Sequence, residues 1–463
     1  MVRAARTVTA ACLVLALGAC AVGPDYERPE LEMPETWRVT PDEAVELANA
    51  GWWTQLGDPV LDELIATALA DNLDVRIAAA RVERFSAALQ TTRSRLMPQL
   101  GYGAGAERSR ASELLLPTGA DPYSTQYQAA LSADWQLDLF GRVRRESEAA
   151  QARVYASRQA QQGVMLSLTA SVAAAYVSLR ALDRQLEIAE ATAANYQGTL
   201  DIFRLRHAQG VVSRLEVAQV ESQYQQAAAT IPLIQGQVAA QENLLSILVG
   251  AAPGAVPRGA VLAELAVPAV PELLPSALLE RRPDVLQAEQ DLVAANADVG
   301  AAQALYFPEI SLTGVLGQVS AALGDLTDSA ARSWSAGAAI AGPLFTGGAV
   351  RGQVAVAEAA REEALLGYQA VVLQALREVN DALAGVTATA ENYAALARRA
   401  DTLREYARLA RMRFDAGAAS YLDVLYADNE LFAAELAAVA ARQSQHANMI
   451  TLYRALGGGW PES

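Results

Sequence analysis

The acidic side chains that could do chemistry follow the second of two glycine-containing turns. Asp423, Tyr426 and Glu430 are three and four residues apart, so a helix starting near Ser420 would place them on one face. An earlier segment carries Glu216 at the position equivalent to Asp423. Carboxylates that share one helix face could bind cations together. Alternatively, acids in the first turn of a helix simply interact favourably with its dipole, and the sequence leaves both interpretations open.

The residue types needed for catalysis are scarce. The two histidines, His207 and His446, fall in different predicted helices and lack metal-ligand spacing. The chain contains neither a nucleophile elbow nor a redox cysteine pair. We therefore expect no enzyme activity, no metal site and no cofactor.

An internal repeat fixes the architecture. The residues Arg206, Gly210, Ser213, Leu215, Glu216 and Val217 recur as Arg413, Gly417, Ser420, Leu422, Asp423 and Val424, at a constant offset of 207. Other landmarks recur upstream in the same order, at offsets between 205 and 210. Each copy predicts a helix, two strands, a long helix, a turn and a second long helix.

The two turns predict the points where one helix ends and the next begins. Glycine tolerates the left-handed conformation that ends a helix, and serine caps the start of the following one. The predicted turns contain Gly210, Val211 and Ser213 in the first copy and Gly417, Ala418 and Ser420 in the second.

Long helices fill most of each repeat. Residues 141–208 and 353–416 contain no proline and are rich in good helix formers. At about 1.5 Å per residue, some 65 residues would extend about 100 Å. Such alanine-rich helices favour close antiparallel neighbours. The helix over 213–249 contains Pro232, which we expect to kink it.

Each repeat also predicts two strands, at about 98–140 and 309–345. Residues 127–139 alternate between apolar and mainly polar side chains over the length of a transmembrane strand. Four strands cannot close a barrel, because their edges would lie unpaired in lipid. The sequence therefore predicts a mixed α/β membrane protein with mostly long helices and four transmembrane strands per chain. A homotrimer would supply a twelve-stranded barrel.

The N-terminus predicts an export signal. Two arginines precede an apolar run over residues 8–17, which is too short to span a membrane. The following Leu-Gly-Ala-Cys resembles the lipobox of bacterial lipoproteins, which implies cleavage of residues 1–19 and lipidation of Cys20. Ala21, rather than aspartate, favours onward sorting to the outer membrane in such proteins. Ordinary cleavage beside an incidental cysteine is the alternative.

The mature chain is strongly acidic. Removing residues 1–19 takes two arginines and no acids, so 34 basic and 52 acidic residues leave a formal charge of −18. This charge argues against a nucleic-acid partner. No other segment has 18 uninterrupted apolar residues, so no spanning helix is expected. The predicted parts are an N-terminal arm with an equatorial segment at 20–60, repeat 1 at 61–250, a proline-rich connector at 251–272, and repeat 2 at 273–459.

Seven landmarks in order carry a family resemblance. They are Cys20–Pro29, Trp52–Pro59, Arg282–Val285, Phe307–Leu312, Pro343–Gly348, Gly417–Leu425 and Leu456–Trp460. The sequence resembles the TolC-like outer-membrane efflux factors, in the lipoprotein (NodT/OprM-type) branch of tripartite RND efflux systems. The resemblance implies a passive trimeric duct in the outer membrane that exports drugs or other small molecules. Its periplasmic helical barrel would dock a periplasmic adaptor (membrane fusion) protein and serve an inner-membrane RND-type pump.

The resemblance also implies roles for the turn residues. The turns would form the adaptor-docking tip, and Asp423 matches a carboxylate that lines a gate near that tip. Tyr426 stands where relatives commonly have a second aspartate, which implies a weaker cation block. Heavy-metal efflux and type I secretion are alternatives within the family. A periplasmic coiled-coil lipoprotein without a pore is the alternative from another class.

Overall fold

The computed structural model describes residues 21–31, 33–34, 36–37, 44–45, 51–117, 119–271 and 275–458. The predicted signal segment, Cys20 and Trp460 lie outside these residues. The chain forms two compact units, and the division falls within four helices. The sheet unit comprises Met1–Glu30, Arg81–Arg158 and Gln287–Gln369, and the hairpin unit comprises Leu31–Ala80, Gln159–Leu286 and Ala370–Ser463.

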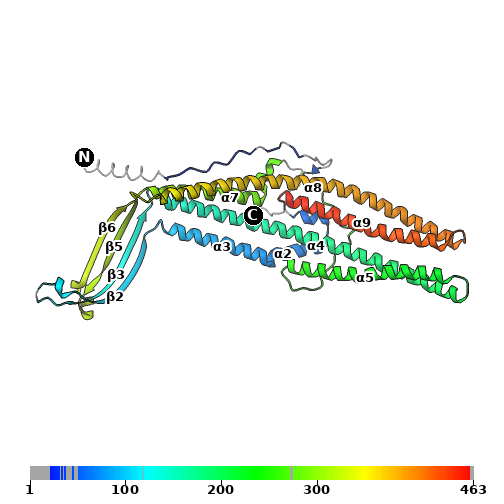
Figure 1. Cartoon of the computed structure of the whole chain (residues 1–463), viewed down its shortest axis with the longest axis horizontal. Helices are drawn as coiled ribbons and strands as arrows, with labels where there is room; N and C mark the ends of the chain where they lie inside the picture. The colour runs from blue at the N-terminus through cyan, green and yellow to red at the C-terminus, as the bar shows by residue number, and fades with distance from the viewer. Residues whose placement is uncertain are drawn as a thin grey trace. The chain divides into compact units, whose positions relative to one another are not determined.

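One antiparallel sheet dominates the sheet unit (Figure 1). Its strands are β2 (Gln99–Arg110), β3 (Tyr123–Leu137), β5 (Glu309–Ser320) and β6 (Arg332–Ala341), in the order β2-β3-β5-β6. The predicted strand pairs of both repeats are confirmed. β2 continues to Arg110, because its last residues pair with the start of β3. Strands of 10 to 15 residues are long enough to cross a bilayer.

The two faces of this sheet differ in chemistry. Tyr102, Leu131, Leu316 and Trp334 are cross-strand partners, so they form one row on one face. Their exposed fractions are 91%, 61%, 56% and 76%. The next row, on the opposite face, is Gly103, Ala130, Gly317 and Ser333. One face is thus apolar and exposed, while the other carries small and polar side chains.

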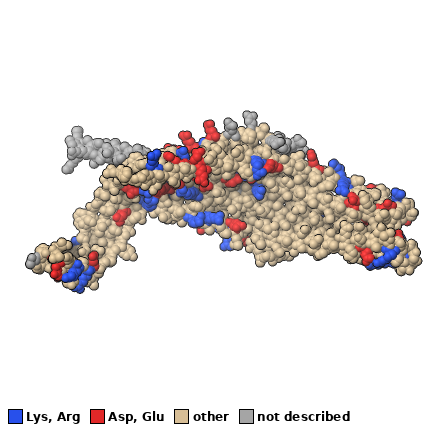
Figure 2. Space-filling view, in the orientation of Figure 1, with Lys and Arg blue, Asp and Glu red and all other residues tan. Residues whose placement is uncertain are grey.

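Along the strands, charged side chains gather at the loop end (Figure 2). Arg110, at the end of β2, pairs with Glu113 at 2.7 Å in the loop that follows. Within the described residues, the surface over the strands themselves is mostly uncharged in this view. This distribution leaves an apolar band on the strands and a polar end.

Long helices make up the rest of the described chain. They are α2 (Pro59–Asp71), α3 (Leu73–Ser94), α4 (Arg142–Ala208), α5 (Arg214–Leu248), α7 (Pro283–Gln303), α8 (Ala349–Asp415) and α9 (Tyr421–Ala455), with a short α6 (Leu278–Arg281). α5 continues through Pro232 without a break. α7 begins at Pro283, where the proline's missing N–H is not needed, with Asp284 in its first turn. The predicted long helices are confirmed within a few residues at each end.

Among the described helices, α4 alone is apolar and long enough to cross a membrane. An 18-residue window of α4 has a mean hydropathy of 1.4, and 67% of that window is buried inside the structure. The buried core helix of a water-exposed domain meets the same criterion, so α4 is weak evidence for a span. Polar residues interrupt this window, so α4 contains no run of 18 apolar residues that would predict a spanning helix from the sequence.

The predicted N-terminal arm is held to the sheet unit by charged groups. Arg28 Nε donates to Glu289 Oε1 at 2.6 Å, and a second guanidinium nitrogen contacts the other carboxylate oxygen. Arg145 Nη2 donates to Asp25 Oδ1 at 2.8 Å. Charge-assisted bonds of this kind are roughly twice as strong as neutral ones. The arm therefore has a defined path along α4 and α7.

Candidate functional site

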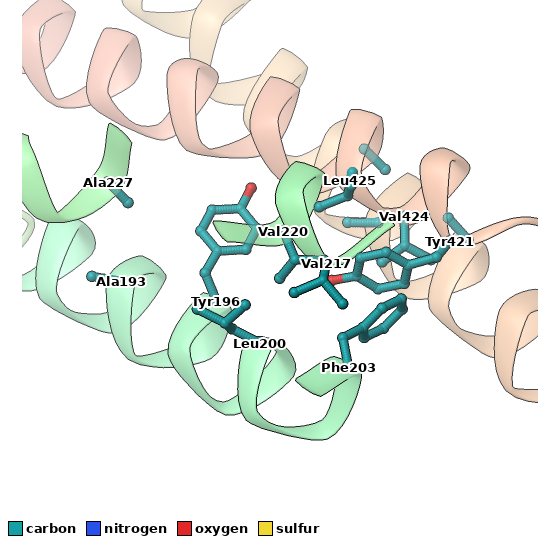
Figure 3. Close-up of a cluster of buried hydrophobic side chains, with 13 residues drawn as sticks. Ala193, Tyr196, Leu200, Phe203, Val217, Val220, Ala227, Tyr421, Val424 and Leu425 are labelled. Carbon is teal, nitrogen blue, oxygen red and sulfur yellow. The ribbon is translucent and has the colours of Figure 1, made fainter. Parts of the chain in front are cut away.

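The two helix turns lie in the hairpin unit, beside one shared apolar core (Figure 3). The core is built from α4 (Ala193, Tyr196, Leu200, Phe203), α5 (Val217, Val220, Ala227), α8 (Ala407, Ala410) and α9 (Tyr421, Val424, Leu425, Ala427). The rings of Phe203 and Tyr421 lie 4.4 Å apart. Because all four helices contribute, the α4–α5 and α8–α9 hairpins form one packed end.

Each turn has the backbone geometry that its glycine predicts. Gly210 has a φ of 75° and Gly417 a φ of 70°, in the left-handed region. Val211 N–H donates to Arg206 O at 2.9 Å, and Gly210 N–H donates to His207 O at 2.9 Å. The second turn repeats both bonds at an offset of 207 residues. These paired bonds satisfy the last carbonyls of α4 and α8.

Both acids of the repeated motif cap the helices that follow. Ser213 N–H donates to Glu216 Oε2 at 2.7 Å, and Glu216 N–H donates to Ser213 Oγ at 3.3 Å. Bonds from Ser213 lower the pKa of Glu216. In the second copy, Ser420 N–H donates to Asp423 Oδ2 at 3.1 Å. The carboxylates at the start of α5 and α9 are therefore engaged in capping.

The structure gives the three candidate gate residues on α9 different partners. Asp423 binds Ser420, while Glu430 forms a 3.0 Å ion pair with Arg399 of α8. Tyr426 is 61% exposed and borders a hollow of about 470 Å³ beside Leu215 of α5. The three residues lie on one face of α9, as their spacing predicts, but their side chains do not contact a common partner. Their role as a gate stays a prediction.

An ion pair that sequence reasoning missed ties together the two helices of each hairpin. Arg411 Nη2 of α8 donates to Asp428 of α9 at 2.8 Å, and burial raises the pKa of Asp428. The first copy has the same pair at an offset of 207, Arg204 with Glu221, at 2.9 Å. The repeat itself was the signal that could have found this pair, because both partners recur at the same offset.

Comparison with known proteins identifies a family over nearly the whole chain. The family model described as outer membrane efflux protein matches residues 64–251 and 274–458. These two stretches contain the strands and both hairpins.

Three relatives illustrate the similarity. The toluene efflux pump outer membrane protein TtgF of Pseudomonas putida is 36% identical over 97% of this chain and 96% of its own length. The cation efflux system protein CusC of Escherichia coli is 32% identical over 97% of this chain and 98% of its own. The crystal structure of the open state of the Neisseria gonorrhoeae MtrE outer membrane channel superimposes with a TM-score of 0.87, at 32% identity. That comparison covers 95% of this chain and 98% of that one.

Proposed function

The chain belongs to the outer membrane efflux protein family, and we propose that it works as a passive homotrimeric exit duct of a tripartite pump. It is an outer-membrane efflux channel component, and its relatives are named as components of efflux pumps. The alternative of a structural lipoprotein without a pore does not fit this family. The trimer, the partner proteins, the lipid anchor and the cargo are the proposed parts.

The two-faced sheet is the observation that supports a shared barrel. β2 and β6 each pair with only one neighbour among the described strands, so one edge of each is unpaired. An unpaired edge is costly in lipid. If β2 of each copy paired with β6 of the next, three copies would give a barrel of twelve strands. The row of side chains that contains Tyr102 would then face lipid, and the row that contains Ser333 would face a water-filled interior.

Edge-to-edge cross-linking tests this arrangement. In the trimer, the loop ends of β2 and β6 meet, so a Ser109→Cys, Ser333→Cys double variant should form covalent dimers and trimers with a short bis-maleimide. Each single variant, in a Cys20→Ser background, is the control and should stay monomeric on a denaturing gel. Planar bilayers should show single-channel conductance for the double variant. Monomers alone after cross-linking, with no conductance, would contradict the proposal.

We further propose that the two turns dock a periplasmic adaptor that connects the duct to an inner-membrane RND-type pump. Val211 is 69% exposed and Ala418 is also exposed, although both are apolar and belong to hydrogen-bonded turns. A Val211→Glu, Ala418→Glu variant should lose efflux while trimer yield and conductance stay normal. Ala194→Glu, at an exposed α4 position away from the turns, is the control. Normal efflux in the turn variant would remove the docking role.

The lipid anchor is proposed at Cys20. Ala21, the next residue, lies against Gly141 at the start of α4, where an added Cβ would be 2.8 Å from the Ala21 Cα. Several acyl chains, at roughly 0.8 kcal/mol per buried methylene, would anchor this end in the outer membrane. Labelling with radioactive palmitate should mark the wild-type chain and not Cys20→Ser. Equal labelling of both would exclude this site.

For the cargo, we propose apolar organic compounds and drugs, as the name of the toluene-pump relative suggests. The name of the cation-efflux relative supports metal cations as the second candidate. A deletion strain complemented with this chain should regain tolerance to toluene and antibiotics. Restored tolerance to metal salts alone would favour the cation candidate.

A further inference from the structure

A cavity of about 410 Å³ lies in the hairpin unit, away from the turns. Its walls come from α4, α8 and α9 and from residues 261–263 of the connector. Apolar side chains such as Leu262, Ala400 and Val439 form part of the lining, and three arginines form another part. Cavities of this volume and mixed character are typical small-molecule sites.

The three lining arginines differ in how their charge is balanced. Arg184 pairs with Glu187 at 2.8 Å, and Arg404 pairs with Asp401 at 2.7 Å and with Glu435 at 2.8 Å. Arg442 contacts no carboxylate within the part of the chain that the structure describes. Arg442 is therefore the one arginine of the three whose guanidinium has no carboxylate partner among the described residues.

The guanidinium of Arg442 is fixed in place and has donors to spare. It donates to Gln445 Oε1 and to Leu265 O, both at 2.9 Å, and its Cζ lies 5.1 Å from the centre of the Tyr393 ring. Its Nε is buried and has no hydrogen-bond partner among the described atoms. A guanidinium has five N–H donors, so most of its capacity is unused.

We propose that this cavity binds an amphipathic organic anion, with a carboxylate or sulfonate on Arg442 and an aromatic-sized apolar body against the remaining walls. An oxyanion would pair with the guanidinium that has no carboxylate partner and accept from its unused donors. A neutral molecule of the same shape would not form this ion pair. The bound anion would contact the connector, α8 and α9 together.

Calorimetric titration of the full-length trimer in amphipol tests the proposal, with 2-naphthoate as the probe. The wild type should bind 2-naphthoate at least tenfold more tightly than 2-naphthylmethanol, which has the same ring system and no charge. Arg442→Gln should weaken naphthoate binding at least tenfold. Arg184→Gln, which removes an already paired arginine of the same cavity, should change it less than threefold.

A second variant separates loss of the site from loss of folding. Ala397→Phe should fill the cavity and abolish naphthoate binding while Arg442 and conductance are retained, since Ala397 borders the cavity and is only partly buried. Absence of naphthoate binding to the wild type would overturn the proposal. Equal affinity for the neutral analogue, or wild-type affinity in Arg442→Gln, would also overturn it.

Discussion

His446 on α9 is fully buried, and neither ring nitrogen has a hydrogen-bond partner among the described residues. Burial, with a contribution from Arg442, lowers the pKa of His446 to about 4 from an ordinary 6.5. The unfolded chain therefore binds a proton at this residue in the range between these values, and the folded chain does not. Folding stability should fall as the pH drops from 6.5 towards 4, by about 3 kcal/mol per chain at most.

Urea unfolding of wild type and His446→Leu at pH 7 and pH 5 measures this contribution. The wild type should lose about 2 kcal/mol more than the variant between these pH values, because leucine has no proton to gain. An identical pH dependence of the two proteins would show that His446 does not titrate as its environment predicts.

Gly259 in the connector is a position where any side chain would collide with a buried acid. An added Cβ would lie 2.0 Å from Asp58 Oδ1, and the Asp58 carboxylate accepts from Tyr176 Oη at 2.6 Å and from Ala260 N–H at 2.9 Å. Gly259→Ala should therefore destabilise the hairpin unit by about 2 kcal/mol or more, through loss of buried hydrogen bonds. The urea midpoint measures the effect.

Gly198 provides the matched control for this substitution. It lies inside α4 with open space around its Cα, so Gly198→Ala should stabilise the helix by about 1 kcal/mol. If both glycine variants shifted the urea midpoint in the same direction, the close contact at Asp58 would not govern stability.

At the scale of the helix, the start of α9 allows the capping and gating roles of Asp423 to be separated. Ser420→Ala and Asp423→Ala each remove the hydrogen bond between these two side chains, and loss of a serine cap costs about 1 kcal/mol. Both variants should thus have similarly lowered stability, but only Asp423→Ala removes a charge. If Asp423 lines a gate, only this variant should lose block of conductance by trivalent cations. Equal block in both variants and the wild type would leave capping as its sole role.

The turns and strands were predictable because their signals are local. Gly210 and Gly417 specify a backbone conformation, and the alternation in residues 127–139 specifies which side chains share a face. The cavity around Arg442 was not predictable, because its walls come from four segments that are distant in sequence. The different partners of Asp423 and Glu430 could not be predicted for the same reason, because Arg399, which pairs with Glu430, belongs to another helix. The periodicity of a sequence shows which side chains share one face of a helix. It does not show which residues of other helices pack against that face.

At the scale of the whole molecule, the proposed shared barrel would make three copies functionally dependent on one another. Among the described strands, the sheet of one copy has two unpaired edges, so the proposed duct would need intact neighbours on both sides. The proposed docking surface should be shared in the same way, because each copy contributes one α4–α5 turn and one α8–α9 turn to it.

Co-expression of the wild type with the Val211→Glu, Ala418→Glu variant tests this dependence. When the two chains are made in equal amounts and mix freely, about one trimer in eight contains only wild-type turns. If docking requires all three copies, efflux should fall to about one eighth, rather than to the half expected for independent monomers. Dye accumulation in cells at matched expression, with Ala194→Glu as the co-expressed control, measures the difference. Retention of half the activity would mean that each copy docks on its own, which would contradict a docking surface that needs the turns of all three copies.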